Sequence, residues 1–163
     1  MVDKNIKKLY NRKRGSFMLK LYLDNCCYNR PFDDLTQEKI NLEANAVETI
    51  FRKHINREIE IYKSMAIDFE ISKINYEKKR RQVEDLYDAM DLKEIAYSYE
   101  IKQRAIALKQ YNIKDMDALH LAFAESENID YFITTDRLLI NNSKRANLGF
   151  IVINPVNFVM EVI

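Results

Sequence analysis

Glycine and proline are scarce in this sequence. Its 163 residues include two glycines, Gly15 and Gly149, and two prolines, Pro31 and Pro155. Walker and dinucleotide-binding loops need several glycines, because their backbone must approach a phosphate closely. Collagen and propeller folds need many more. The scarcity therefore excludes these classes, and so few helix breakers favour a chain rich in helix.

Cysteine is equally scarce, and no long apolar run occurs. Cys26 and Cys27 are adjacent, which is too close for an ordinary disulfide and is not the spacing of a zinc knuckle. No apolar stretch approaches the roughly 20 residues that span a bilayer. The basic start is not followed by the apolar core of a signal peptide. We therefore expect reduced thiols, a cytoplasmic location and no membrane partner.

The chain also lacks a net charge of one sign. Its 26 Lys and Arg residues face 25 Asp and Glu residues, so the total indicates neither a nucleic-acid nor a membrane partner. Residues 1–20 nevertheless hold seven basic residues and one acidic residue, a sum of +6, which leaves −5 for residues 21–163. We predict one domain over residues 18–163. Residues 1–17 form a basic extension, either a flexible arm or the product of an early start codon.

Apolar segments alternate with segments of helical periodicity along the domain. Thr36, Ser64, Asp115 and Asp136 are predicted helix N-caps, and residues 25–34 are a predicted loop. Such alternation favours an α/β fold in which helices cover both faces of a parallel, doubly wound sheet. Predicted strands span 19–24, 59–62, 94–99, 131–135 and 150–153, and predicted helices span 37–56, 65–73, 76–90, 101–110 and 115–127, with a short one after Asp136.

Acidic residues fall where the ends of parallel strands meet. Asp24 ends the first strand, and Asp136 follows the fourth. Asp117 lies in the first turn of the helix before that strand, and Glu70 lies on the helix after the second strand. Ligands collect at the carboxyl edge of such sheets. Converging carboxylates repel one another unless a cation neutralises them, so this pattern predicts a site for Mg²⁺ and phosphodiester chemistry.

Three of these acids also have a purely structural interpretation. Asp136 is suited to cap the next helix, and Asp117 is suited to the positive end of a helix dipole. Glu70 on an amphipathic segment is typically a solvated charge. Asp24 has no comparable structural role.

Four segments taken together resemble a known family. In chain order they are LYLDN, DFEIS, DALHLAFAE and FITTD. This set resembles the PIN domain, a family of metal-dependent nucleases that includes the toxins of many bacterial toxin–antitoxin pairs. The likeness runs from about Met18 to the carboxyl terminus. It maps the four acids of the family onto Asp24, Glu70, Asp117 and Asp136, and an assisting polar residue onto Thr134.

The resemblance implies both a fold and an activity. The fold is a three-layer α/β/α arrangement with about five strands in the order 3-2-1-4-5. The activity is endonucleolytic hydrolysis of single-stranded RNA with Mg²⁺ or Mn²⁺, leaving a 5′-phosphate and a 3′-hydroxyl. The expected partners are the RNA substrate, a cognate antitoxin and a second copy of the chain. We expect Asn25, Arg30 and Thr134 to contact the substrate.

Two residue assignments stay open. Glu43 rivals Glu70 as the second metal ligand, because it lies on the apolar stripe of helix 37–56, where a charge must be paired or bound to metal. Arg30 is suited to hold a phosphate with two nitrogens, but pairing with Asp33 or Asp34 is an equal alternative. His120, one turn after Asp117, is interpreted as a packed helix residue.

Two other functions are consistent with this fold class. One is a PIN-like module that binds RNA or a partner protein without turnover. The other is a phosphoacceptor receiver domain, which also ends a strand with Asp. Receiver domains need a Lys at the end of a later strand, and the segment FIVINP at 150–155 contains none. The nuclease is therefore the favoured hypothesis.

Overall fold

The computed structural model describes residues 18–163. The predicted basic extension at 1–17 lies outside these residues. Five parallel strands form one sheet in the order β3-β2-β1-β4-β5. Their bounds are β1 Leu19–Leu23, β2 Ile59–Lys63, β3 Lys93–Glu94, β4 Tyr131–Ile133 and β5 Ile151–Ile153. The predicted α/β fold and strand order are confirmed.

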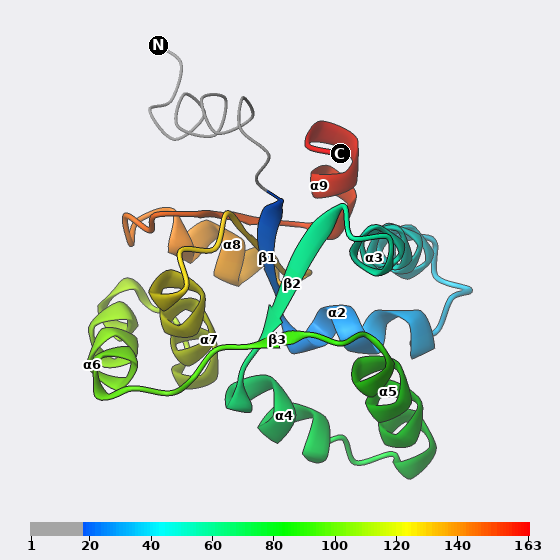
Figure 1. Cartoon of the computed structure of the whole chain (residues 1–163), viewed down its shortest axis with the longest axis horizontal. Coiled ribbons are helices and arrows are strands. Elements are labelled where there is room, and N and C mark those ends of the chain that lie inside the picture. The colour runs from blue at the N-terminus through cyan, green and yellow to red at the C-terminus, as the bar shows by residue number, and fades with distance from the viewer. Residues whose placement is uncertain (1–17) are drawn as a thin grey trace.

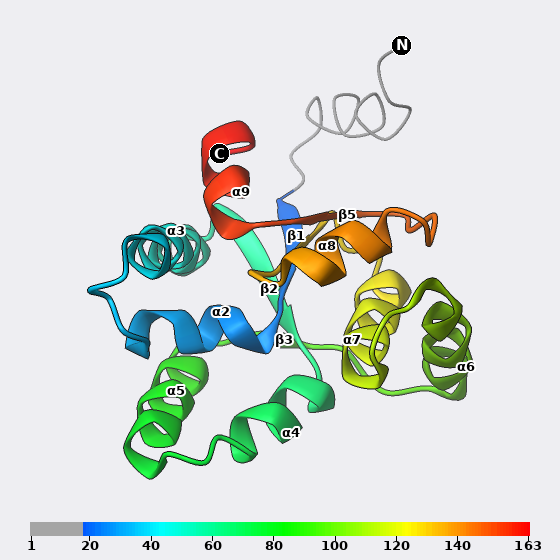
Figure 2. The same ribbon diagram turned by 180° about the vertical axis from the view of Figure 1, so that it is seen from behind.

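Helices cover both faces of the sheet. The α-helices are α2 Asn25–Asn29, α3 Glu38–Ile55, α4 Met65–Ser72, α5 Glu77–Ala89, α6 Tyr99–Leu108, α7 Asp115–Ser126, α8 Arg137–Ser143 and α9 Pro155–Glu161, and the 3-10 helices are η1 Arg30–Phe32 and η2 Lys109–Tyr111. In Figures 1 and 2, α6, α7 and α8 lie on one side of the sheet and α3, α5 and α9 on the other. None of the helices within 18–163 is long and apolar enough to cross a bilayer.

Several local predictions differ from the structure. Residues 25–32 form α2 and η1, not a loop. Thr36 does not cap α3, because its hydroxyl donates to Asp34 at 2.6 Å, and α3 begins at Glu38 with Gln37 as its N-cap. Asp115 is the first residue of α7, whose N-cap is Lys114. For Thr36, the side chain of Asp34 competes successfully with the helix for the hydroxyl.

The two ends of the sheet also differ from the prediction. The predicted strand 94–99 shrinks to the exposed residues Lys93 and Glu94, since only one neighbouring strand is available to an edge strand. Helix α9 was not predicted. Its start nevertheless has a local signal, because Asn154 accepts a hydrogen bond from the Val156 amide and Pro155 occupies the first turn.

Packing and register align the carboxyl ends of β1 and β4. Leu21, Tyr22 and Leu23 of β1 and Phe132 and Ile133 of β4 are fully buried, as expected for strands covered on both faces. The register pairs Leu23 with Ile133, and the Asp24 amide donates to the Ile133 carbonyl at 2.9 Å. The residues that follow β1 and β4 are therefore held side by side.

The neighbouring strands β1 and β4 mark the point where the chain direction reverses. From β1 the chain proceeds outward to β2 and β3, then returns across the sheet to β4 and continues to β5. Helices α3 and α5, which lie between the strands of the first half, are therefore on one side of the sheet, and α7 and α8, which flank β4, are on the other, as Figure 1 shows. A crevice between such halves, at the carboxyl ends of the strands, is where open α/β sheets bind ligands.

Candidate metal centre

Asp24 lies at the centre of this edge. It is the residue between β1 and α2 and is only 7 % exposed. Its Oδ2 accepts hydrogen bonds from the Thr134 hydroxyl at 2.7 Å and from the Cys26 thiol at 3.4 Å. Burial raises the pKa of Asp24, His120 and the Thr134 hydrogen bond oppose this rise, and the nearby Glu70 charge adds to it. The carboxylate is thus oriented by neighbours but incompletely neutralised.

The segment after β4 holds Asp24 in place. Thr134 is fully buried, and its Oγ1 accepts from the Asp136 amide at 3.1 Å while it donates to Asp24. The Thr135 amide donates to the Cys26 sulfur at 3.3 Å. Thr134 therefore acts on the Asp24 carboxylate directly. Its predicted contact with substrate stays a prediction.

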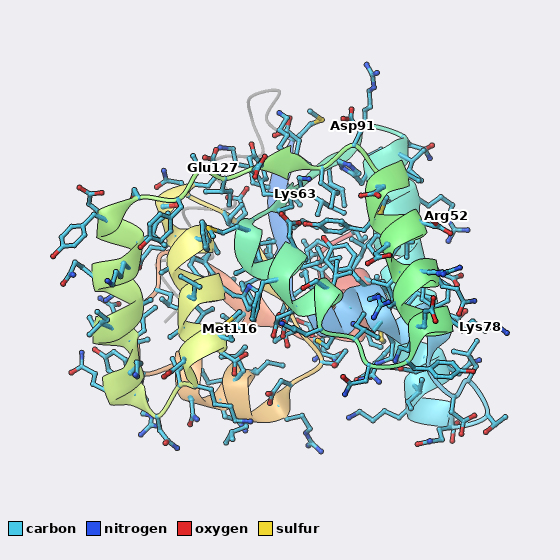
Figure 3. The ribbon with its side chains drawn as sticks, turned by 90° about the horizontal axis from the view of Figure 1, so that it is seen from below. Arg52, Lys63, Lys78, Asp91, Met116 and Glu127 are labelled. Atoms are coloured by element: carbon cyan, nitrogen blue, oxygen red, sulfur yellow. The ribbon has the colours of Figure 1, made fainter. Side chains whose placement is uncertain are left out.

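Glu70 and His120 complete a compact group with Asp24. One ligand atom from each of these three residues lies within 4.8 Å of the others, and within 18–163 this is the one such group of His, Cys, Asp and Glu side chains. His120 Nε2 and Glu70 Oε2 are 2.6 Å apart. Helix α4, which carries Glu70, packs against α7, which carries His120. Figure 3 shows α4 across the carboxyl edge, with Met116 marking the start of α7 beside it.

A buried hydrogen-bond chain extends behind His120. Its Nδ1 lies 2.8 Å from the Tyr22 hydroxyl, which lies 2.6 Å from the Ser64 Oγ. Tyr22, Ser64 and His120 are all 0 % exposed. His120 thus contacts Glu70 through Nε2 and Tyr22 through Nδ1, and the tautomer of the imidazole sets the direction of each hydrogen bond. The chain fixes the imidazole ring that faces Glu70.

The charges of Asp24, Asp136 and Glu70 affect the carboxyl group of Asp117. It is partly buried in the first turn of α7, which lies next to this edge. Burial, together with the charges of Asp24 and Asp136, raises the pKa of Asp117 to about 6. Such a shift marks a carboxylate crowded by like charge. A cation close to Asp24, Asp117 and Asp136 would reduce the repulsion between their charges.

Asp136 caps the N-terminus of α8, as the sequence predicted. Its Oδ1 accepts hydrogen bonds from the Leu138 and Leu139 amides at 2.8 and 3.1 Å, so the predicted capping of α8 is confirmed. Asp136 and Asp117 line the same small hollow. Capping through one oxygen leaves the other free for a ligand, and the metal role of Asp136 stays a prediction.

Glu43 lies in a different environment. It is 2 % exposed, and its Oε2 is 3.0 Å from Arg30 Nη2. Its Oε1 accepts from Asn154 Nδ2 at 3.0 Å and lies 3.8 Å from Lys39 Nζ. The buried charge is therefore paired with cations, which is one of the two outcomes expected for it. The structure brings Glu70, and not Glu43, into the group around Asp24.

Arg30 is occupied by other residues of the chain. Its Nη1 donates to Asp33 at 2.9 Å, and its Nη2 donates to the Thr135 hydroxyl at 2.9 Å. Together with Glu43, these contacts match the alternative in which Arg30 pairs with a nearby acid. Asn25 accepts two hydrogen bonds from the Asn29 side chain, at its carbonyl and at Oδ1. Binding of substrate by Arg30 or Asn25 stays a prediction.

The donor set fits a hard divalent cation. Carboxylate oxygens are the preferred ligands of Mg²⁺ and Mn²⁺, and here they come from Asp24 and Glu70, with Asp117 near enough to be perturbed by both. Sequence reasoning missed the contact of His120 with Glu70. Its one signal was the spacing of Asp117 and His120, which places both on one face of a helix. Comparison with known protein families and with curated protein sequences found no match.

Proposed function

We propose that this protein is a metal-dependent endoribonuclease of the PIN kind, which hydrolyses single-stranded RNA with Mg²⁺ or Mn²⁺. The observation that carries the proposal is the group formed by Asp24, Glu70 and His120 at the reversal point of the sheet. The pKa of Asp117, raised to about 6 by burial and by neighbouring acids, supports it. Acids that repel one another at a ligand-binding edge are typical of functional sites.

The residues of the chain have separable roles in this proposal. Asp24, Glu70 and Asp117 would hold the cation, and Asp136 would hold it through the oxygen that does not cap α8. A bound divalent ion supplies Lewis-acid polarisation of the phosphate and lowers the pKa of a coordinated water. Thr134 orients the Asp24 carboxylate by donating to Oδ2. Arg30 supports the same segment through Thr135.

His120 is a positioning residue in this scheme. It touches Glu70 at 2.6 Å, and its other nitrogen is held by Tyr22. Residues that orient metal ligands in this way typically change metal affinity or activity by about 10- to 100-fold when they are removed. A general base is not required of His120, because cation chemistry can supply the nucleophile.

The proposal is tested with purified protein and a labelled single-stranded RNA. Wild-type protein should cleave the RNA with Mn²⁺ or Mg²⁺, stop in EDTA and leave 5′-phosphate ends. Asp24→Asn should lower cleavage by more than about 100-fold, since removing a ligand exceeds the effect of removing a residue that orients one. Asp115→Asn, the same change at an exposed acid of α7 outside the acid group, is the control.

Two results would overturn the proposal. The first is cleavage that survives Asp24→Asn with unchanged metal dependence. The second is the absence of cleavage combined with RNA or protein binding that Asp24→Asn leaves intact, which identifies the module without turnover. A toxin role has its own readout. Expression of the wild type, and not of Asp24→Asn, should arrest growth.

A further inference from the structure

A second recess lies beside the acid group. It has a volume of about 390 Å³. Three elements meet there: the first turns of α3, helix α8 and the start of α9. The side chains used below are Lys39, Leu42, Glu43, Arg137, Ile140 and Val156.

The recess carries positive charge. Lys39 is 64 % exposed, and Arg137 is also exposed. Arg137 forms no ion pair with any residue in 18–163. The acid in the wall, Glu43, is compensated from below by Arg30 at 3.0 Å. Lys39 Nζ also lies 3.8 Å from Glu43 Oε1, so Glu43 is shared by two cations while Arg137 has no acid partner within 18–163. The rim is therefore net positive and attracts an anion from solution.

The walls of the recess are apolar. Leu42 is 53 % exposed although it is a large aliphatic residue. Ile140 and Val156 are partly buried on the facing elements. Cations at the rim and aliphatic side chains inside suit a ligand with a charged part and a flat, apolar part. A nucleotide has both, because a phosphate bears the charge and a base presents an apolar face.

Hydrogen bonds connect the recess with the acid group. Arg30 Nη2 contacts Glu43 at 3.0 Å and donates to the Thr135 hydroxyl at 2.9 Å. The preceding residue, Thr134, donates to Asp24 at 2.7 Å. Arg137 follows Asp136 directly in the chain, so their Cα atoms are about 3.8 Å apart. The recess that Arg137 lines therefore adjoins Asp136, one of the acids proposed to hold the cation.

We propose that this recess binds the nucleotide of an RNA strand that adjoins the one at the acid group. Its phosphate lies between Lys39 and Arg137, and its base packs on Leu42, Ile140 and Val156. The inference rests on the proposed function for the choice of RNA as ligand. It goes beyond that function by assigning a contact outside the acid group that influences which nucleotide flanks the cleaved bond.

Binding is measured without metal, so that cleavage does not intervene. The probe is a fluorescein-labelled single-stranded RNA of ten nucleotides, followed by anisotropy in EDTA at several salt concentrations. Lys39→Gln combined with Arg137→Gln should weaken binding by about 10-fold and lower the salt slope by about 0.7, because the two cations hold one phosphate and each single-strand phosphate contributes about 0.7. Leu42→Ser should weaken binding and leave the salt slope unchanged.

The control has the same change in net charge. Arg52→Gln with Lys102→Gln removes two exposed cations, one about 20 Å further along α3 and one on α6. This control should keep most of the affinity. All four basic side chains are exposed, so the variants are expected to fold, and thermal unfolding verifies it.

Each outcome separates the inference from the proposed function. Equal affinities for the Lys39/Arg137 double variant and its control would overturn the inference, whether or not the wild type cleaves RNA. Loss of affinity in the double variant alone supports it, even if no cleavage is found. Inorganic phosphate that binds as tightly as AMP, CMP, GMP and UMP, with no effect of Leu42→Ser, would overturn the placement of the base.

Discussion

Asp24 and Glu43 are both buried acids at the carboxyl edge of the sheet, yet their surroundings differ. Glu43 is 2 % exposed and faces Arg30 at 3.0 Å, Lys39 at 3.8 Å and the Asn154 amide. Asp24 is 7 % exposed and has hydroxyl and thiol donors, with Glu70 nearby as a like charge. Glu43 is neutralised by the chain itself. Asp24 is oriented by the chain and left short of positive charge.

The difference distinguishes an acid paired with cations of the chain from one that lies among other acids. A buried charge that is fully paired stabilises a local arrangement or at least does no harm to it, whereas carboxylates gathered without a cation raise the free energy of the folded chain. The pKa values of Asp24 and Asp117 are raised for this reason, after the larger effect of burial. A chain retains such crowding where a ligand relieves it.

The largest expected effect is the loss of stability that follows when the ion pair between Arg30 and Glu43 is broken. Arg30→Met leaves Glu43 buried without its closest cation, which should destabilise the protein by about 3 kcal/mol and lower the melting temperature by about 10 °C. Thermal unfolding measures it. Adding Glu43→Met to the same chain should recover most of the loss, because the unpaired charge is then gone. A single variant as stable as the wild type would contradict the pairing.

The next effect concerns the chain behind His120. Tyr22→Phe removes the hydroxyl that lies 2.6 Å from Ser64 and 2.8 Å from His120, so two buried groups lose a partner and stability should fall by about 2 kcal/mol. The cation concentration that half-activates cleavage should rise by about 10-fold, since Glu70 is then held less firmly. Unfolding in EDTA and a Mn²⁺ titration measure the two effects.

Tyr28→Phe is the matched control for this change. Tyr28 is also fully buried, but its hydroxyl has no hydrogen-bond partner among the described residues. Removing that hydroxyl should leave stability unchanged or raise it slightly. Equal effects of the two substitutions, on stability and on the Mn²⁺ requirement, would contradict the positioning role of His120.

Replacing Asp117 should change the free energy of unfolding by a smaller amount, and it should raise that free energy where the changes above lower it. Its folded-state pKa of about 6 exceeds the ordinary value of 3.8, so the folded chain binds more protons than the unfolded chain between these values. The free energy of unfolding is therefore highest below about pH 4 and falls as the pH rises through 6. Asp117→Asn should remove this dependence and stabilise the chain at pH 8 in EDTA by about 1 kcal/mol, a figure reduced for partial exposure.

The pH series is measured by chemical denaturation with and without Mn²⁺. Mn²⁺ should restore stability to the wild type at pH 8 and have less effect on Asp117→Asn. Asp115→Asn, two residues away and exposed, should follow the wild type. A wild type whose stability rises between pH 4 and 7, with no change in Asp117→Asn, would show that crowding at Asp117 is absent.

The smallest expected effect is the loss of stability on replacing Lys39, the more distant of the two cations near Glu43. Lys39 is 64 % exposed and 3.8 Å from Glu43, so Lys39→Met should change stability by less than about 0.5 kcal/mol. Arg30, which is largely buried, should account for nearly all of the pairing. Denaturant unfolding of the two single variants tests the ranking. A larger loss for Lys39→Met than for Arg30→Met would reverse the assignment.

Much of the fold could be predicted from local patterns. Apolar segments predicted β1, β2, β4 and β5, and the helical stripes predicted α3, α5 and α7 within a few residues, whereas the predicted strand 94–99 shares only Glu94 with β3. The failures occurred where neighbouring groups compete. Thr36 donates to Asp34 instead of capping α3, and the edge strand β3 is held by one neighbour only. Such competition depends on geometry that periodicity does not describe.

The site was predicted in part for the same reason. Asp24 and Asp136 follow strands, so their place at the edge follows from parallel pairing alone. The choice between Glu70 and Glu43 does not, because both lie on helices facing the sheet. Packing of α4 on α7 brings Glu70 to His120 across 50 positions of sequence, while packing of α3 on η1 brings Glu43 to Arg30.

The sequence by itself determined the alternation of strands and helices and the acids that end the strands, since both depend on residues close together in the chain. Tertiary structure decided which buried acid is neutralised and which is left crowded. It also placed His120 between Tyr22, 98 positions away, and Glu70. The physical reason is that the charge state of a buried carboxylate depends on partners within a few ångströms, and only folding chooses those partners.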